Sequence, residues 1–518
     1  MSDPTKRGAR PSRCKTPKAS EALGERSREG SPRQLPHLAA LLGPTGPELA
    51  RAFASATGYL RRRSPRELLS EVGTTIGSLP AVTHLDKAFF QASFRTGATA
   101  EGEDLLAGQG LFFITEHRRL FLDATAGHYQ MTWGYNHPRL IEALREALEA
   151  GLVWDDHSNI PGDTVKQLSR KLVELANARP AATPPAREGR GRQPKPAATD
   201  LESDPQALNR VLLGIATGSV ACSTAIKLAL NYFQSTRGGG TPVFVALAGN
   251  YHGTDLVAQR LRGMWTDYLG HLPVALIEPN DTEALRETFA HSGSQVAAMF
   301  VEPVMMNREA IALERDYLLE ARRLCDEHDA LLVFDEIQTG FWTEKFFSAV
   351  ALGVKPDILV VGKGMTAGFH PLAAVLYRRK YDSLAQYDAI STNGNAPLPA
   401  YMALASIALI EEERARIARA AHHYRQALEA LPGEFPRLLR AIHGDGLLVG
   451  IKFHAVEAAK EFHRRSLAAG LWLRLHAYHE GHATALTKFA LLLDEETADF
   501  FLALVREILR AMNKKSGG

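Results

Sequence analysis

Short apolar runs alternate with helical and turn-rich segments from about residue 210 to about residue 376. The runs are apolar almost throughout, which is typical of strands buried on both faces of a parallel sheet. The helical patterns between them supply the crossover connections that parallel strands require. The runs read RVLLGIA, PVFVALAG, PVALIEP, QVAAMFVEP, ALLVFDE and DILVVG. The pattern therefore predicts an α/β fold with a mostly parallel sheet covered by helices.

The flanking regions have a different character. Proline and glycine divide residues 36–82 into helical stretches, and we expect an N-terminal helical segment over 36–110. Near the other end, a long helical pattern leads to GDGLLVGIKFH and a final helix at TADFFLALVREILRAM. This predicts a large domain over 111–400 and a smaller α+β domain over 401–518.

Two stretches lack the apolar residues that a folded core requires. Residues 1–35 are rich in Arg, Lys, Ser and Pro, and residues 178–207 are rich in Pro, Ala and Arg. We expect the first to be a disordered basic tail and the second a disordered insertion within the large domain. A basic arm for RNA or a membrane is the alternative for the tail, but its mixed charges and lack of interleaved aromatic residues favour a solvated segment.

Composition narrows the class of function. The chain has 45% hydrophobic and 23% charged residues, a formal net charge of +2, and no apolar run of the roughly 20 residues that a membrane helix needs. We therefore expect a soluble protein with small-molecule partners, no nucleic acid and no membrane. The three cysteines are far apart and form no CxxC pair, which favours a reducing compartment, and we expect the cytoplasm.

Polar residues follow the expected strands at one edge of the sheet. Ligands of open α/β sheets bind outside the carboxyl ends of the strands. The residues at these ends are Thr217, Gly218, Ser219, Tyr251, His252, Glu302, Asp335, Glu336, Gln338 and Lys363. Their concentration at one edge predicts a polar site on an apolar body.

Three features of this edge match one cofactor. Lys363 follows a buried strand, where a desolvated amine can attack carbonyl groups. Asp335 ends another strand, where a buried carboxylate needs a cation, and the turn at Gly218 and Ser219 opens a helix whose N–H groups bind anions. A lysine for a Schiff base, an acid for a cationic ring nitrogen and a phosphate cradle are what pyridoxal phosphate requires.

These residues also carry a family resemblance. LLVFDEIQTGFW followed by GVKPDILVVGKGMTAGFHPLAAV resembles the signature of the class III aminotransferases, which are fold type I pyridoxal phosphate enzymes. The likeness runs from about residue 111 to the C-terminus. It includes GYNHP at 134–138, TGSVA at 217–221, YHG at 251–253, EPV at 302–304 and STNGNAPL at 391–398. It implies a large cofactor domain and a smaller C-terminal domain.

The resemblance assigns a role to each matching residue. Lys363 corresponds to the Schiff-base lysine, which also carries a proton between the substrate and the cofactor. Asp335 corresponds to the acid paired with the pyridinium nitrogen and Gln338 to the residue near the cofactor hydroxyl. Tyr251 corresponds to the aromatic residue that stacks on the cofactor ring.

The remaining matches concern the phosphate, the substrate and the partner subunit. Gly218 and Ser219 correspond to the phosphate-binding turn, and Glu302 to a glutamate on the substrate side. Thr392 corresponds to a threonine that reaches the phosphate of a partner subunit. The resemblance thus implies a homodimer with shared active sites that moves an amino group from an amino acid or amine to a keto acid.

The sequence departs from the family around the substrate. Val220, Cys222 and Ala396 occupy positions where other residues are usual. TKFALLLDEE takes the place of a segment that in many members adjoins the arginine binding a substrate carboxylate, and the candidates for this function here are Arg474 and Lys488. The substrate pocket is therefore expected to be altered.

Several alternatives stay open. A racemase, a decarboxylase or an aminomutase uses the same lysine and cofactor. A non-catalytic interaction protein on the same scaffold is a more remote alternative. His476, His479 and His482 lie close together and invite a metal interpretation, but they form no HExxH motif or Cys/His ligand spacing, and we expect no metal.

Overall fold

The computed structural model describes residues 36–82, 104–152, 160–178, 198–392, 394–477 and 481–515. The expected tail over 1–35, most of the expected insertion and His479 lie outside these residues. None of the helices in the described part of the chain combines the length and the apolar character that a membrane crossing requires.

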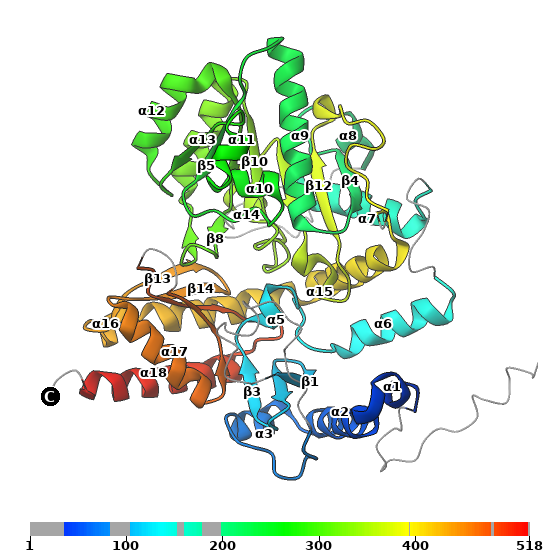
Figure 1. Ribbon diagram of the computed structural model, residues 1–518, viewed down its shortest axis with the longest axis vertical. Coiled ribbons are helices and arrows are strands. Elements are labelled where there is room, and N and C mark those ends of the chain that lie inside the picture. Colours follow the sequence, from blue (N-terminus) through cyan, green and yellow to red (C-terminus); the bar gives the residue numbers. More distant parts are fainter. Residues whose placement is uncertain are drawn as a thin grey trace, which may run out of the picture.

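A seven-stranded sheet forms the centre of the upper part of the molecule (Figure 1). Its strand order is β4-β12-β11-β10-β7-β5-β6, and only β12 runs antiparallel to its neighbours. The strands are β4 (Arg210–Ile215), β5 (Val243–Leu247), β6 (Val274–Ile277), β7 (Val296–Val301), β10 (Leu331–Asp335), β11 (Ile358–Val361) and β12 (Ala373–Tyr377). The predicted mostly parallel α/β sheet is confirmed.

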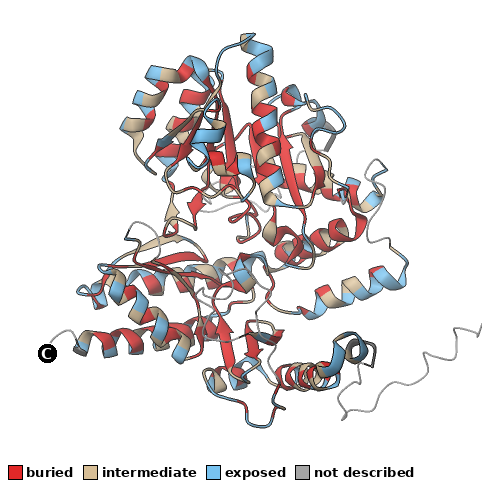
Figure 2. Ribbon diagram, in the orientation of Figure 1, coloured by how far each residue is buried: buried red, intermediate tan, exposed pale blue. Residues whose placement is uncertain are grey.

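Both faces of this sheet are buried (Figure 2). Leu332 and Phe334 of β10 point into one core and Val333 into the other, because successive side chains of a strand alternate between faces. The long helix α9 (Gly218–Arg237) covers the second face, and α12 (Thr282–Ser292) and α13 (Arg315–Glu327) cover the first. The shorter helical elements are α10 (Leu256–Arg260), α11 (Thr266–Leu269), η2 (Gly293–Gln295), α14 (Ser348–Leu352), η3 (Lys363–Thr366) and η4 (Arg379–Tyr381).

The N-terminal part contains helices and a small sheet. The helices are α1 (Pro36–Leu41), η1 (Gly43–Thr45), α2 (Gly46–Arg61) and α3 (Pro65–Glu71). The sheet has the order β1-β2-β3-β15, so that a C-terminal strand joins three N-terminal ones. These strands are β1 (Leu105–Gln109), β2 (Phe112–Thr115), β3 (Leu120–Asp123) and β15 (Leu471–Trp472). Three helices follow β3 in the chain: α5 (Ala126–Tyr129), α6 (Pro138–Glu149) and α7 (Asp163–Ala176).

The end of the expected insertion is ordered rather than disordered. Residues 198–207 include α8 (Ala198–Ser203), which contacts α7. Leu201, Ala207 and Leu208 are buried, and the Asn209 side chain donates to the carbonyls of Leu201, Glu202 and Asp204. These few apolar and capping residues anchor the return of the chain into β4.

The C-terminal part packs below the large sheet. It contains α15 (Pro397–Glu429), α16 (Leu431–Glu434), α17 (Val456–Ala468) and α18 (Glu495–Lys515). A second four-stranded sheet has the order β13-β14-β17-β16, with β13 (Leu439–Asp445), β14 (Leu448–Phe453), β16 (Arg474–His476) and β17 (Thr484–Lys488). The two-stranded ribbon of β8 (Val304–Met305) and β9 (Ile311–Ala312) contacts β13.

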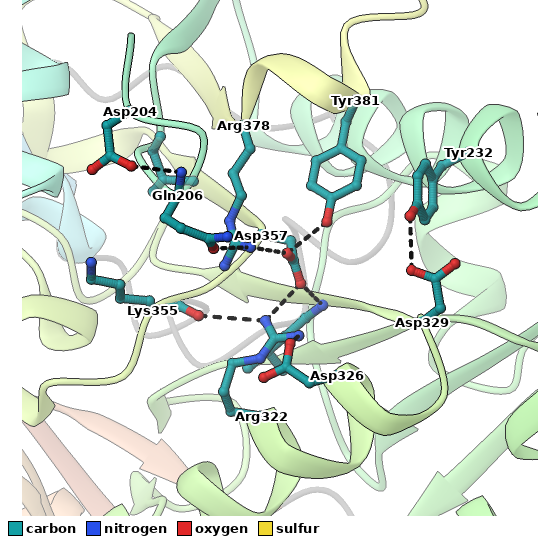
Figure 3. A network of polar contacts seen from close by, with 12 residues as sticks. Asp204, Gln206, Tyr232, Arg322, Asp326, Asp329, Lys355, Asp357, Arg378 and Tyr381 are labelled. Carbon is teal, nitrogen blue, oxygen red and sulfur yellow. Dashed lines mark hydrogen bonds and ion pairs between the residues drawn. The ribbon is translucent and has the colours of Figure 1, made fainter. Parts of the chain in front are cut away.

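A buried charge network fixes the start of β11 (Figure 3). The carboxylate of Asp357 lies 2.6 Å from Arg322 and 3.2 Å from Arg378, and it accepts hydrogen bonds from Leu332 N and Tyr381 Oη. Burial raises the pKa of Asp357, but the two arginines and these donors outweigh burial and hold the pKa below its usual value. The network thus fixes the strand whose other end leads to Lys363.

Candidate functional site

The carboxyl ends of five strands bring the predicted residues to one place. Gly218 follows β4, Tyr251 follows β5, Glu302 follows β7, Asp335 ends β10 and Lys363 follows β11. Because β11, β10, β7 and β5 are neighbours and parallel, these ends lie along the same edge. Sequence spacing and the strand order therefore produce the cluster.

Lys363 lies in a strained turn. It is the first residue of η3, its φ is +40°, and a left-handed backbone is uncommon for a residue other than glycine. Such strain is typical of functional sites, where the surroundings impose it. Burial lowers the pKa of its amine, and the charges of Asp335 and Glu302 partly oppose that shift. The Nζ atom lies 5.9 Å from the centre of the Tyr251 ring.

Asp335 is held by three donors. Its Oδ2 lies 2.7 Å from His252 Nδ1 and 3.3 Å from Cys222 Sγ, and its Oδ1 accepts from Ile337 N at 3.0 Å. Burial alone lowers the pKa of His252, but the hydrogen bond and the charge of Asp335 outweigh it, so the pKa is raised. The carboxylate therefore has a fixed orientation and keeps free lone pairs for a cationic partner.

His252 is paired with a carboxylate. Its side chain contacts the Asp335 carboxylate, and both side chains are buried. Cys222, His252 and Asp335 bring three ligand-type atoms within 4.8 Å of one another. The hydrogen bonds between these atoms explain this proximity without an ion.

Glu302 and Gln338 form a second pair beside the lysine. The Glu302 carboxylate accepts from Tyr251 N at 2.7 Å and from Gln338 Nε2 at 3.4 Å. The pKa of Glu302 is raised to about 7, and burial is the largest cause of this shift. Gln338 Oε1 is buried and has no hydrogen-bond partner among the described residues. A bound group with a donor is the usual partner of such an atom.

The start of α9 forms an anion cradle. Thr217 accepts from Val220 N at 3.5 Å, and Ser219 Oγ accepts from Thr254 N at 2.9 Å. A Cβ atom on Gly218 would lie 2.7 Å from Ile337 Cδ1, and one on Gly253 would lie 2.5 Å from Ser219 Oγ. Gly253, with a φ of +129° and the Ser219 Cα atom 2.6 Å from such a Cβ, therefore requires glycine, whereas a Cβ at Gly218 would push the Ile337 side chain aside. The start of α9 is thus suited to bind an anion through its backbone N–H groups.

These features fit pyridoxal phosphate. Lys363 would supply an amine for its carbonyl carbon, Asp335 a fixed carboxylate for its ring nitrogen, and the α9 cradle an anion site for its phosphate. The orphaned Gln338 Oε1 provides a further acceptor on the same edge. The residues present therefore match the donor and acceptor pattern of this cofactor.

Thr392 does not join the other candidates. It is exposed, and among the described residues it makes no hydrogen bond to any of them. Sequence reasoning gave no role to Cys222 or His128, and it named Lys488 only as one of two candidates for carboxylate binding. All three adjoin the site. The signal for Cys222 was its departure from the family pattern, whereas His128 and Lys488 carry no local motif.

The fold and the family match define a pyridoxal phosphate enzyme of fold type I. The Aminotransferase class-III family model matches residues 104–508. An acetylornithine aminotransferase of Agrobacterium fabrum is 29% identical over 363 residues, which cover 67% of this chain and 79% of that protein. An ornithine aminotransferase of Emericella nidulans is 31% identical over 259 residues, which cover 46% of this chain and 56% of that protein.

Solved structures agree on the fold. The ornithine aminotransferase of Toxoplasma gondii, described with partial occupancy of PLP at its active site, matches with a TM-score of 0.67 at 23% identity. That match covers 83% of this chain and 95% of the other. The chain belongs to the class III aminotransferase family. It is a pyridoxal 5'-phosphate-dependent aminotransferase, and its substrates are an amino donor and a keto acceptor.

Proposed function

We propose that Lys363 is the residue that binds the cofactor and moves the proton in this aminotransferase. The observation that carries the proposal is the depressed pKa of an amine that shares one sheet edge with Asp335 and the α9 cradle. A neutral amine is a nucleophile and a base, so Lys363 can bond to the cofactor carbonyl and later exchange a proton with the substrate carbon. The cofactor, when bound, supplies the electron sink.

The neighbouring residues have supporting roles in this proposal. Asp335 holds the ring nitrogen in its cationic form, and His252 and Cys222 hold Asp335. Tyr251 covers one face of the ring, and Gln338 faces the ring hydroxyl with its unpaired acceptor. Glu302 lies on the substrate side, where a pKa of about 7 lets it accept or release a proton near neutral pH.

Transamination can be tested without knowing the natural substrates. We expect the visible absorbance of the lysine-bound cofactor to fade when candidate amino acids or amines are added without a keto acid, and to return when a keto acid follows. The similarity to acetylornithine and ornithine aminotransferases makes acetylornithine and ornithine the first donors to test. Consumption of a donor without fading would instead indicate racemisation, decarboxylation or aminomutation. Lys363→Ala serves as the control.

We also propose a homodimer that shares its active sites. Support comes from Thr392, which is exposed and makes no hydrogen bond to the α9 cradle among the described residues. Large apolar side chains are exposed on and around α10 and α11, which follow the cradle contact at Thr254: Leu256, Met264, Trp265 and Tyr268. A second subunit would cover such a surface. An active monomer in sedimentation would contradict the proposal.

The cytoplasm is the proposed location. The buried cysteines Cys222 and Cys325 are free thiols, as expected in a reducing compartment. Fractionation that recovers the protein with a secreted fraction would contradict this location.

The division of the chain into an N-terminal segment over 36–110, a large domain over 111–400 and a small domain over 401–518 remains a prediction. Limited proteolysis, which cuts between domains, would test it.

A further inference from the structure

The turn that carries Lys363 is strained along its length. Lys363 has a φ of 40°, Ala367 a φ of 54° and Gly368 a φ of 81°. Residues other than glycine rarely adopt this left-handed conformation, because their Cβ atom comes too close to a carbonyl oxygen. The turn therefore keeps its shape only where the surrounding structure imposes it.

The Lys363 amine depends on this backbone for its direction. Among the residues that the structure describes, Lys363 Nζ makes no hydrogen bond and no ion pair, and it lies 5.9 Å from the centre of the Tyr251 ring. The conformation of the turn thus decides where the amine points. A displacement of the turn would move the amine relative to Asp335 and to the α9 cradle.

The Thr132 side chain ties this turn to the rest of the protein. Thr132 is fully buried in the segment before α6, and its Oγ1 donates a hydrogen bond to the Gly364 carbonyl oxygen at 2.7 Å. Gly364 directly follows Lys363 in the chain. The Thr132 carbonyl in turn accepts from Leu491 N at 2.7 Å, in the segment after β17. Thr132 thus joins the lysine turn to a segment near the other end of the chain.

Glycine at position 364 allows this close approach. A Cβ atom on Gly364 would lie 2.6 Å from Thr132 Oγ1 and 3.1 Å from Trp342 Nε1, so a larger residue would push Thr132 away. The Gly364 carbonyl also accepts from Ala367 N at 3.1 Å, so it keeps one partner when the Thr132 hydroxyl is removed. Loss of the hydroxyl should therefore act on the position of the turn rather than on the folding of the chain.

We propose that Thr132 is a positioning residue for Lys363, whose hydroxyl holds the strained turn so that the amine faces the cofactor edge. This inference rests on the proposed function of Lys363, since the position of the turn matters only if that lysine bonds to the cofactor. A group held in the correct geometry reacts without the cost of being oriented first. Thr132 should therefore affect the bond between Lys363 and the cofactor and leave the contacts of the phosphate and the ring unchanged.

Two forms of the cofactor separate these effects. Pyridoxal phosphate bonds to a lysine through its aldehyde, whereas pyridoxamine phosphate carries an amine in that place and depends on the other contacts alone. We would prepare full-length apoprotein and measure its affinity for each form by titration. The ratio of the two affinities reports the bond to Lys363, whereas a general distortion of the site changes both affinities together.

Substitutions at Thr132 supply the test. In Thr132→Val a methyl group replaces the donor and would lie 2.7 Å from the Gly364 oxygen, closer than the roughly 3.3–3.6 Å of a carbon–oxygen contact. We expect this variant to lower the preference for pyridoxal phosphate by about three- to tenfold, the range of one hydrogen bond. Thr132→Ala, which removes the donor without crowding the carbonyl, should do the same and replaces the first variant if valine prevents folding.

Two control variants should keep the wild-type preference. Thr132→Ser retains the hydroxyl and can still donate to Gly364. Thr115→Val is the matched control, because Thr115 is a buried threonine on β2 whose hydroxyl accepts from Arg119 N. Preference retained in these two variants and lost in Thr132→Val and Thr132→Ala is the result that the proposal predicts.

Several results would overturn the proposal. They are an unchanged preference in Thr132→Val and Thr132→Ala, an equal loss of affinity for both cofactor forms, and a loss in Thr132→Ser as large as in Thr132→Val. Lys363→Ala separates this inference from the proposed function. A wild-type preference for pyridoxal phosphate in that variant contradicts the role of Lys363, whereas loss of the preference there but not in Thr132→Val or Thr132→Ala contradicts only this inference.

Discussion

Replacing Asp335 by Asn should weaken cofactor binding because it removes the counter-charge of the ring nitrogen. The side chain is buried, and its two oxygens already accept from His252, Cys222 and Ile337. Asn keeps the size of Asp but turns one acceptor into an N–H donor. Whichever way the amide lies, that donor faces Ile337 N or the pair of donors from His252 and Cys222.

The expected loss follows from these contacts. A hydrogen bond to a charged group contributes about 1.5–3 kcal/mol, and each 1.4 kcal/mol is a factor of about ten in affinity. The cofactor should therefore bind about 10- to 100-fold more weakly to Asp335→Asn. His252 loses the charge that raises its pKa, so burial should lower the pKa of its imidazole in the variant.

Titration of apoprotein with pyridoxal phosphate, followed by absorbance, measures this change. Asp163→Asn is the control, since the Asp163 side chain lies at the exposed start of α7. Unfolding curves of the apo variants report whether the substitution acts on folding instead. Wild-type cofactor affinity in Asp335→Asn would refute the pairing of this carboxylate with the ring nitrogen.

Three further substitutions test other parts of the account. Asp357→Asn leaves buried Arg378 without a carboxylate and Arg322 with Asp326 alone, and it should cost about 3–5 kcal/mol in urea unfolding. Because the pKa of Asp357 is lowered, its wild-type contribution should be lost as the pH falls, and a cost of the substitution below about 1 kcal/mol would contradict the network. Gly218→Ala should weaken cofactor binding by about tenfold through the contact with Ile337, whereas Gly77→Ala, with open space around it, should not. The pKa of Glu302 is raised to about 7, so the unfolding free energy of the apoprotein should fall as the pH rises from about 4.5 to about 7. Glu302→Gln should remove that fall. The same dependence of stability on pH in the wild-type protein and in Glu302→Gln would contradict the raised pKa.

The strands of the central sheet could be predicted from the sequence because they are buried on both faces and read as continuous apolar runs. The antiparallel direction of β12 could not, since AAVLY after Pro371 has the same composition as its parallel neighbours. Direction depends on the short connection after η3, which leaves no room for a crossover. The helix α8 could not be predicted either, because it lies in a stretch rich in Pro and Ala and is anchored by only a few buried residues, among them Leu201.

Some contacts of the site could likewise be predicted from the sequence, and others could not. Asp335 and Lys363 follow adjacent parallel strands, so their proximity could be inferred from the fold class. The contacts of Asp335 with His252 and Cys222, and of Arg474 with His128, join residues that are between 83 and 346 positions apart in the chain. Such pairs depend on tertiary packing, and no local pattern reports them. Sequence analysis could therefore name Arg474 and Lys488 together but could not choose between them.

The most direct test of the account is to locate the covalent bond between the chain and its cofactor. Borohydride reduction of the holoenzyme fixes this bond, and peptide mass spectrometry identifies the modified lysine. The account predicts that Lys363 carries the cofactor and that Lys363→Ala carries none. Modification of Lys488, the other lysine at the site with a depressed pKa, or of no lysine at all, would contradict it.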